Sequence, residues 1–204
     1  MNLRDLLQKA RVLPVLQILD AEQAVPLARA LAEGGLNVLE VTLRSDAALE
    51  AIRRIDAEVS EVVVGAGTVT RPQDFDNIRQ AGARFAVSPG LTPELAAAGR
   101  DADLPFLPGI MTPSEALVAR QRGFDTLKLF PATTAGGIDL LRSIGGPLPE
   151  LAFCPTGGLN AASFRDYLAL PNVLCVGGSW VAPRSAVEAA DWPTITRLAR
   201  EACS

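Results

Sequence analysis

Short apolar runs alternate with longer amphipathic stretches along nearly the whole chain. Eight runs rich in valine, leucine and other apolar residues indicate strands, at 12–18, 37–43, 61–67, 84–90, 104–110, 125–131, 151–157 and 172–178. Apolar residues recur at helical spacing in 20–35, 45–58, 71–82, 92–100, 112–123, 136–146, 160–170 and 192–202. The pattern predicts an α/β protein in which strands and helices alternate.

Eight strand–helix units predict a (β/α)₈ TIM barrel, with residues 1–204 as one domain. The stretches 79–89 and 120–131 both repeat a helix end, a glycine and a strand, as repeated units would. A typical barrel of this kind has ~250 residues, so the loops of this chain must be short. A doubly wound open sheet is the alternative fold.

Local signals refine the ends of the elements. Asp20 is a candidate N-cap for the helix in 20–35, and the glycines at its end are typical stop signals, although Pro26 is unusual within a helix. Residues 1–13 interleave charge with leucine, which predicts a short amphipathic N-terminal helix and not a signal peptide. No apolar run is long enough to span a bilayer, so we expect a cytoplasmic protein with no membrane partner.

Composition narrows the possible chemistry. The formal charge is −4, so no basic excess favours nucleic acid. Histidine is absent, which excludes Ser-His-Asp and Cys-His nucleophiles and removes the commonest ligand of a catalytic zinc. We expect no metal and no cofactor. The three cysteines, Cys154, Cys175 and Cys203, form no disulfide framework, and the first two are expected to be reduced and buried.

Two predicted strands carry polar residues that share one face. Lys128 lies in the apolar strand 125–131, and its position in the alternation directs it toward the barrel axis. Glu40, Thr42 and Arg44 share one side of their strand, and leucine and valine occupy the other. We therefore expect these polar groups to converge inside the barrel, near its carboxyl end.

A lysine inside an apolar barrel is desolvated, which makes its neutral amine accessible. A neutral amine can attack a ketone, and the resulting iminium withdraws electrons from the neighbouring carbon–carbon bond. Glu40 is the available proton shuttle. A structural ion pair would explain Lys128 or Glu40 equally well if either stood alone, and Arg44 alone would be read as a solvated rim charge. Together they favour function.

Glycine-rich segments follow the last two predicted strands. Barrels often bind phosphate through the backbone at the seventh and eighth loops. The candidates for such a site are Thr156, Gly157, Gly158, Gly178 and Ser179. Glycine turns alone are weak evidence, because most of them bind nothing. Thr68, just after the third predicted strand, is expected near the same end of the barrel.

Several motifs occur together in an order that identifies a family. "LEVTLR", "GAGTV", "VSPGLT", "PGIMTPSE", "LKLFPA", "FCPTGGL" and "VGGSW" cover nearly the whole chain. In this set the sequence resembles bacterial 2-keto-3-deoxy-6-phosphogluconate (KDPG) aldolases, which also act on 4-hydroxy-2-oxoglutarate (KHG). The resemblance implies a class I aldolase of the Entner–Doudoroff pathway, a (β/α)₈ fold and a homotrimer. Its products would be pyruvate with glyceraldehyde 3-phosphate from KDPG, or with glyoxylate from KHG.

The resemblance also assigns roles to individual residues. It makes Lys128 the Schiff-base residue and Glu40 the acid/base. Arg44, with help from Thr68, would bind the substrate carboxylate. Pro89 and Phe130 would form pocket walls, and the phosphate would be held by Thr156, Gly157, Gly158 and Ser179.

Two other functions remain open from the residues alone. A sugar-phosphate epimerase or isomerase on a phosphate-binding barrel would use the same glycine loops, and a non-catalytic module could bind a phosphorylated acid. Neither needs an inward lysine that forms an imine, so Lys128 favours the aldolase.

Overall fold

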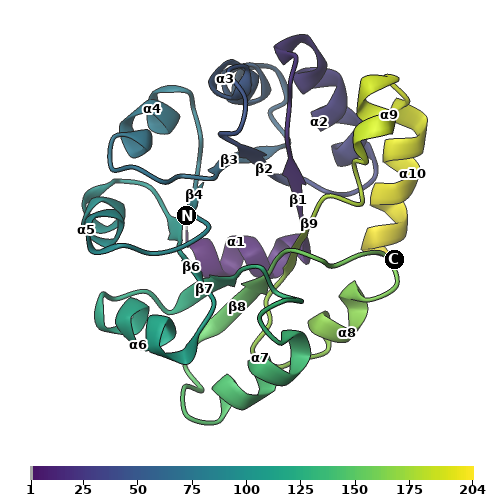
Figure 1. The fold of residues 1–204 in the computed structure, drawn as a ribbon. Helices are drawn as coiled ribbons and strands as arrows, with labels where there is room; N and C mark the ends of the chain where they lie inside the picture. The colour runs from purple at the N-terminus through teal and green to yellow at the C-terminus, as the bar shows by residue number, and fades with distance from the viewer. Residues whose placement is uncertain (1) are drawn as a thin grey trace.

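The computed structural model describes residues 2–204, and its parallel strands lie inside a ring of helices (Figure 1). The strands are β1 Val12–Leu16, β2 Val38–Thr42, β3 Val63–Gly67, β4 Ala86–Val87, β5 Phe106–Leu107, β6 Gly109–Ile110, β7 Thr126–Leu129, β8 Ala152–Pro155 and β9 Val176–Gly178. They form a six-stranded sheet in the order β5-β4-β3-β2-β1-β9 and a three-stranded sheet in the order β6-β7-β8. The predicted α/β alternation is confirmed, with parallel strands that curl into a half-barrel.

Apart from α9, which the sequence pattern did not predict, the helices lie within or close to the predicted ranges. They are α1 Leu3–Ala10, η1 Ala21–Gln23 (a 3-10 turn), α2 Ala24–Glu33, α3 Ala48–Glu58, α4 Asp74–Gln80, α5 Pro93–Asp101, α6 Pro113–Gln121, α7 Gly137–Gly145, α8 Phe164–Leu168, α9 Arg184–Glu188 and α10 Trp192–Cys203. Asp20 caps the 3-10 turn by accepting from the Glu22 N–H at 2.9 Å. Pro26 lies in the first turn of α2, where its missing N–H costs no helical hydrogen bond.

The fifth predicted strand is divided in two. Residues 104–110 were expected to form one strand, but Pro108 lacks an N–H and separates β5 from β6. Its carbonyl still accepts from the Lys128 N–H at 2.8 Å, so β6 begins the second sheet. Between β8 and the last strand, single bridges join Phe153 to Val173 and Thr156 to Gly177.

Two apolar clusters hold the fold together. The larger one fills the space between the strands and the outer helices. The smaller one lies within the curve of the strands, where Leu6 and Leu7 of α1 pack with Leu13, Val38, Phe85, Val87, Leu107, Cys154 and Cys175. Because Leu13 and Val38 lie at the amino ends of their strands, α1 covers that end and leaves the carboxyl ends of the strands open.

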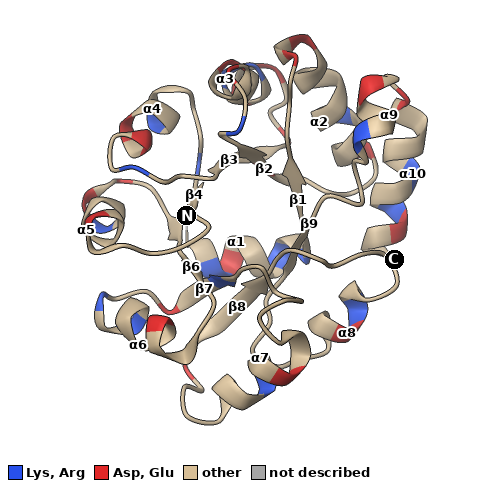
Figure 2. Ribbon diagram, in the orientation of Figure 1, with Lys and Arg blue, Asp and Glu red and all other residues tan. Residues whose placement is uncertain are grey.

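Charge lies mainly on the outer helices and their loops, with both signs interspersed (Figure 2). Within residues 2–204, no helix is long and apolar enough to cross a membrane. Because most charged residues lie on the outer elements, the buried polar side chains on the inner faces of the strands are unusual, and they mark the candidate site.

Candidate active site

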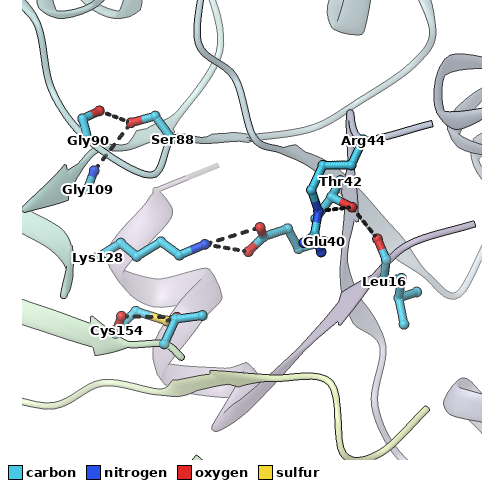
Figure 3. A network of polar contacts seen from close by, with 10 residues as sticks. Leu16, Glu40, Thr42, Arg44, Ser88, Gly90, Gly109, Lys128 and Cys154 are labelled. Atoms are coloured by element: carbon cyan, nitrogen blue, oxygen red, sulfur yellow. Dashed lines mark hydrogen bonds and ion pairs between the residues drawn. The ribbon is translucent and has the colours of Figure 1, made fainter. Parts of the chain in front are cut away.

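Lys128 and Glu40 meet in the interior from opposite strands (Figure 3). The Lys128 Nζ lies 3.2 Å from Glu40 Oε1 and 3.4 Å from Oε2, and the two residues are only 5% and 1% exposed. Lys128 comes from β7 and Glu40 from β2, so the ion pair bridges the two sheets. Alternation along both strands predicted this convergence, and the two groups lie within hydrogen-bond distance of each other.

Arg44 is positioned by a short hydrogen-bond chain beyond the end of β2. Its Nε donates to Thr42 Oγ1 at 3.2 Å, and that hydroxyl donates to the Leu16 carbonyl of β1 at 2.9 Å (Figure 3). Thr42 is buried, whereas Arg44 is exposed at the rim. The terminal nitrogens of Arg44 remain available for an anion. The anchoring role of Thr42 could not be predicted, because its acceptor belongs to another strand.

Thr68 follows β3 in a backbone conformation that L-residues rarely adopt. Its φ is 62°, which costs free energy and is found disproportionately at functional sites. The preceding Gly67 has a packing reason to be glycine, since a Cβ there would overlap the Glu40 carboxylate. Thr68 therefore directly follows the residue that packs against the Glu40 carboxylate. Within residues 2–204, no hydrogen bond joins Thr68 to Glu40 or Lys128.

Pro89 lies beside β6, and Phe130 directly follows the lysine strand β7. A Cβ on Gly109, which is the β6 partner of Lys128, would overlap the backbone of Pro89. The Lys128 Nζ lies 5.4 Å from the centre of the Phe130 ring. Buried Ser88 fixes the turn before Pro89, because its hydroxyl donates to the Gly90 carbonyl and accepts from the Gly109 N–H at 3.3 Å. Ser88 was missed by sequence reasoning.

The loop after β8 has a backbone conformation that requires glycine. Gly157 and Gly158 have φ of 98° and 84°, consecutive values that only glycine adopts at low cost. The Ala132 N–H donates to Thr156 O at 2.8 Å, and the Thr133 N–H donates to Gly157 O at 3.2 Å. A Cβ on Gly157 would lie 3.3 Å from the Phe130 ring, so the loop adjoins the lysine pocket.

Gly178 is the last residue of β9, and Ser179 follows it at the rim of the strand array. A Cβ on Gly178 would overlap the Trp180 ring, which explains the glycine by packing. Ser179 is exposed and lines a cavity of about 220 Å³ together with Arg44. The structure therefore groups Lys128, Glu40 and Phe130 in the interior, with Arg44 and Ser179 together at the rim.

Two buried thiols lie beneath the ion pair. Cys154 is the strand neighbour of Lys128, and Cys154 and Cys175 belong to the inner cluster. A hydrogen bond with Cys154, then burial, raises the pKa of the Cys175 thiol well above its ordinary value. Cys175 therefore remains protonated at neutral pH and is not a nucleophile. Both cysteines are free and buried, as the sequence predicted.

Comparison with known proteins gives one consistent result. The family model for KDPG and KHG aldolase matches residues 3–198. The KHG/KDPG aldolase of Escherichia coli K12 is 51% identical over 191 residues, which span 94% of this chain and 90% of that protein. A 2-dehydro-3-deoxy-phosphogluconate aldolase of Pseudoalteromonas atlantica is 48% identical over 199 residues, spanning 98% of this chain and 93% of that one.

A solved structure of the Legionella pneumophila KDPG aldolase superposes with a TM-score of 0.95 at 44% identity. The match covers 97% of this chain and 96% of that one. That structure contains pyruvate captured as a covalent carbinolamine.

Proposed function

We propose that this chain, which belongs to the KDPG and KHG aldolase family, is a class I aldolase that cleaves KDPG to pyruvate and glyceraldehyde 3-phosphate. KHG, cleaved to pyruvate and glyoxylate, is its second substrate. The observation that carries the proposal is the buried contact of 3.2 Å between the Lys128 amine and the Glu40 carboxylate. An epimerase or a binding module does not need a lysine that forms an imine, whereas a class I aldolase needs the amine to form the imine and the carboxylate to move protons.

The chemistry follows from the pair. The Lys128 ammonium passes a proton to Glu40, and the freed amine adds to the C2 ketone and loses water to give an iminium. Glu40 gives this proton to the departing hydroxyl and is a carboxylate again. It then takes the proton of the C4 hydroxyl, the C3–C4 bond breaks and C4 leaves as the aldehyde, and the electrons of that bond move through C3 to neutralise the iminium as an enamine. Glu40 returns a proton to C3, and hydrolysis of the new iminium frees pyruvate and the amine.

The remaining residues serve the two ends of the substrate. Arg44, oriented by Thr42, binds the carboxylate of the pyruvoyl unit with help from Thr68. Pro89 and Phe130 form the walls around the reacting carbons. The phosphate is bound by Thr156, Gly157, Gly158, Gly178 and Ser179, through backbone N–H groups and the serine hydroxyl.

The finer features of the architecture belong to the same proposal. We propose that the nine strand segments form one closed (β/α)₈ barrel in a single domain. The junction of β5 and β6 at Pro108 and the two single bridges beside β8 support this proposal. The family resemblance supports a homotrimer acting in the cytoplasm.

Borohydride trapping tests the mechanism directly. In the presence of pyruvate, borohydride is expected to reduce an imine on Lys128 to a stable secondary amine, which peptide mass spectrometry locates. Lys9, the only other lysine in the sequence, is an internal control in α1. An adduct on Lys9 alone, or no adduct, would contradict the imine mechanism.

Ser179→Ala tests the phosphate end. The change removes one hydrogen bond to a charged oxygen, so kcat/KM for KDPG is expected to fall about ten- to a hundredfold. Cleavage of KHG should change far less, because that substrate has no phosphate. An equal loss with both substrates would assign Ser179 to the barrel or the imine instead of the phosphate.

A further inference from the structure

The rim cavity beside Ser179 is lined by two charged residues, Arg184 and Glu188, that have no role in the proposed function so far. It lies between the carboxyl end of β1 and the segment after β9, and it is lined by Val15, Leu16, Gln17, Leu19, Gln23, Leu27, Arg44, Ser179, Ala182, Pro183, Arg184, Val187 and Glu188. Two arginines and one glutamate line it. The cavity is therefore suited to a small anionic group that enters beside Ser179.

Arg184 is carried into this lining by a short connected segment. The Ala182 N–H donates to the Ser179 carbonyl at 3.1 Å, and the Ala186 N–H donates to Pro183 at 2.9 Å. Val181 is fully buried and Ala186 nearly so, which fixes the backbone on both sides of Arg184. The position of Arg184 relative to Ser179 is thus set by local structure, while its side chain remains 76% exposed.

The ion pair of Arg184 with Glu188 uses only one N–H donor of the guanidinium. Its Nε donates to Glu188 Oε1 at 2.6 Å, as an (i, i+4) pair on α9. A guanidinium has five N–H donors, and phosphate carries more charge than a carboxylate. Because the pair with Glu188 is exposed, water weakens it, and a phosphate can compete for the remaining donors.

We propose that Arg184 is a specificity-determining residue that attracts the distal phosphate of the substrate into the rim cavity beside Ser179, and that Glu188 opposes this attraction. The inference rests on the proposed function and adds a residue to it. KHG ends in a carboxylate at C5, whereas the phosphate of KDPG is attached through the C6 oxygen and reaches farther. Arg184 therefore distinguishes the two substrates by reach as well as by charge.

The test compares three variants of the intact enzyme. Arg184→Gln is expected to raise the KM for KDPG about two- to fivefold at low salt and less at physiological ionic strength, with kcat unchanged. The KM for KHG should change by less than about twofold. Glu188→Gln should lower the KM for KDPG. Arg197→Gln is the matched control, because Arg197 forms a similar exposed pair with Glu201 at 2.7 Å and does not line the cavity.

Calorimetric titration with inorganic phosphate separates this inference from the proposed function. Arg184→Gln should weaken phosphate binding about two- to fivefold, and Arg197→Gln should not. Three results would overturn the role of Arg184. They are equal losses of phosphate affinity in the two arginine variants, an equal rise of the KM for KDPG and KHG in Arg184→Gln, or an unchanged KM for KDPG. If pyruvate trapping on Lys128 persists in those cases, the aldolase proposal stands without it.

Discussion

The buried pair of Lys128 and Glu40 is a costly arrangement that needs a reason. Both charges are almost completely removed from water, and the hydration lost by such ions offsets much or all of their mutual attraction. An apolar pair of similar volume would often be as stable or more so. The chain nevertheless has this pair at the point where Gly67 leaves room for the carboxylate. Function explains the pair better than stability does.

Glu40→Gln separates imine formation from proton transfer. The variant keeps a side chain of nearly the same shape but cannot accept or return the proton, so turnover should fall by about two to four orders of magnitude. Steady-state kinetics measures that loss. Borohydride with pyruvate should still label Lys128 on prolonged incubation, because water can take the lysine proton in place of Glu40, though more slowly. Glu150→Gln, on the surface, is a control with normal turnover. Normal turnover in Glu40→Gln would mean that another group or a water moves the proton.

At the scale of single residues, strand alternation was sufficient to place the buried pair of Lys128 and Glu40. Period-two patterning directs every second side chain inward, so Glu40 and Lys128 could be predicted to converge without their strands being paired. Thr42 and Ser88 could not be identified as anchors, because each bonds to backbone groups of another strand or turn. Such partners depend on how strands are packed and leave no local pattern.

At the scale of elements, the differences between the predicted and the observed strands and helices have local causes. A run of apolar residues hid the break at Pro108, since its hydrophobic pattern continues through the proline. Helix α9 was missed because its five residues, Arg184–Glu188, are too few to show a helical period. That omission matters, because α9 carries Arg184 to the rim. In contrast, α6 was predicted near its true boundaries, and Thr112 with Glu115 forms a capping box at its start.

Glu115 makes the stability of this region depend on pH. Partial burial acts to raise the pKa of its carboxyl, but hydrogen bonds from the Met111 N–H, the Thr112 side chain and the Thr112 N–H lower it overall. A lowered folded pKa means that its contribution is present above the ordinary value of 4.5 and is lost as pH falls through the folded pKa. Glu115→Gln should therefore destabilise the protein at pH 7 and become neutral in acid.

Denaturant unfolding at neutral and at acidic pH measures this difference. Glu61→Gln is a control, because Glu61 is an exposed glutamate outside any helix. A Glu115→Gln deficit that stays constant from pH 7 into acid would show that shape and not charge is responsible.

At the scale of the molecule, the two ends of the strand array have different tasks. The amino end is covered by α1 and filled by the small inner cluster, while the carboxyl end holds the polar site. Cys154 and Cys175 belong to that cluster, and Cys154 is the strand partner of Lys128. Apolar packing from α1 thus reaches the residues directly beneath the ion pair, so helix α1 supports the site from the amino end of the strands.

Leu7→Ala tests this support. Leu7 is fully buried against the inner cluster, so truncation should lower the free energy of unfolding by about 2–5 kcal/mol, from lost burial and the cavity left behind. Leu3→Ala on the same helix is the matched control and should cost less, because Leu3 is only partly buried. Denaturant unfolding gives both values, and pyruvate trapping at low denaturant shows whether Lys128 still reacts. If Leu7→Ala costs no more than Leu3→Ala, α1 is a surface attachment and the inner cluster closes without it.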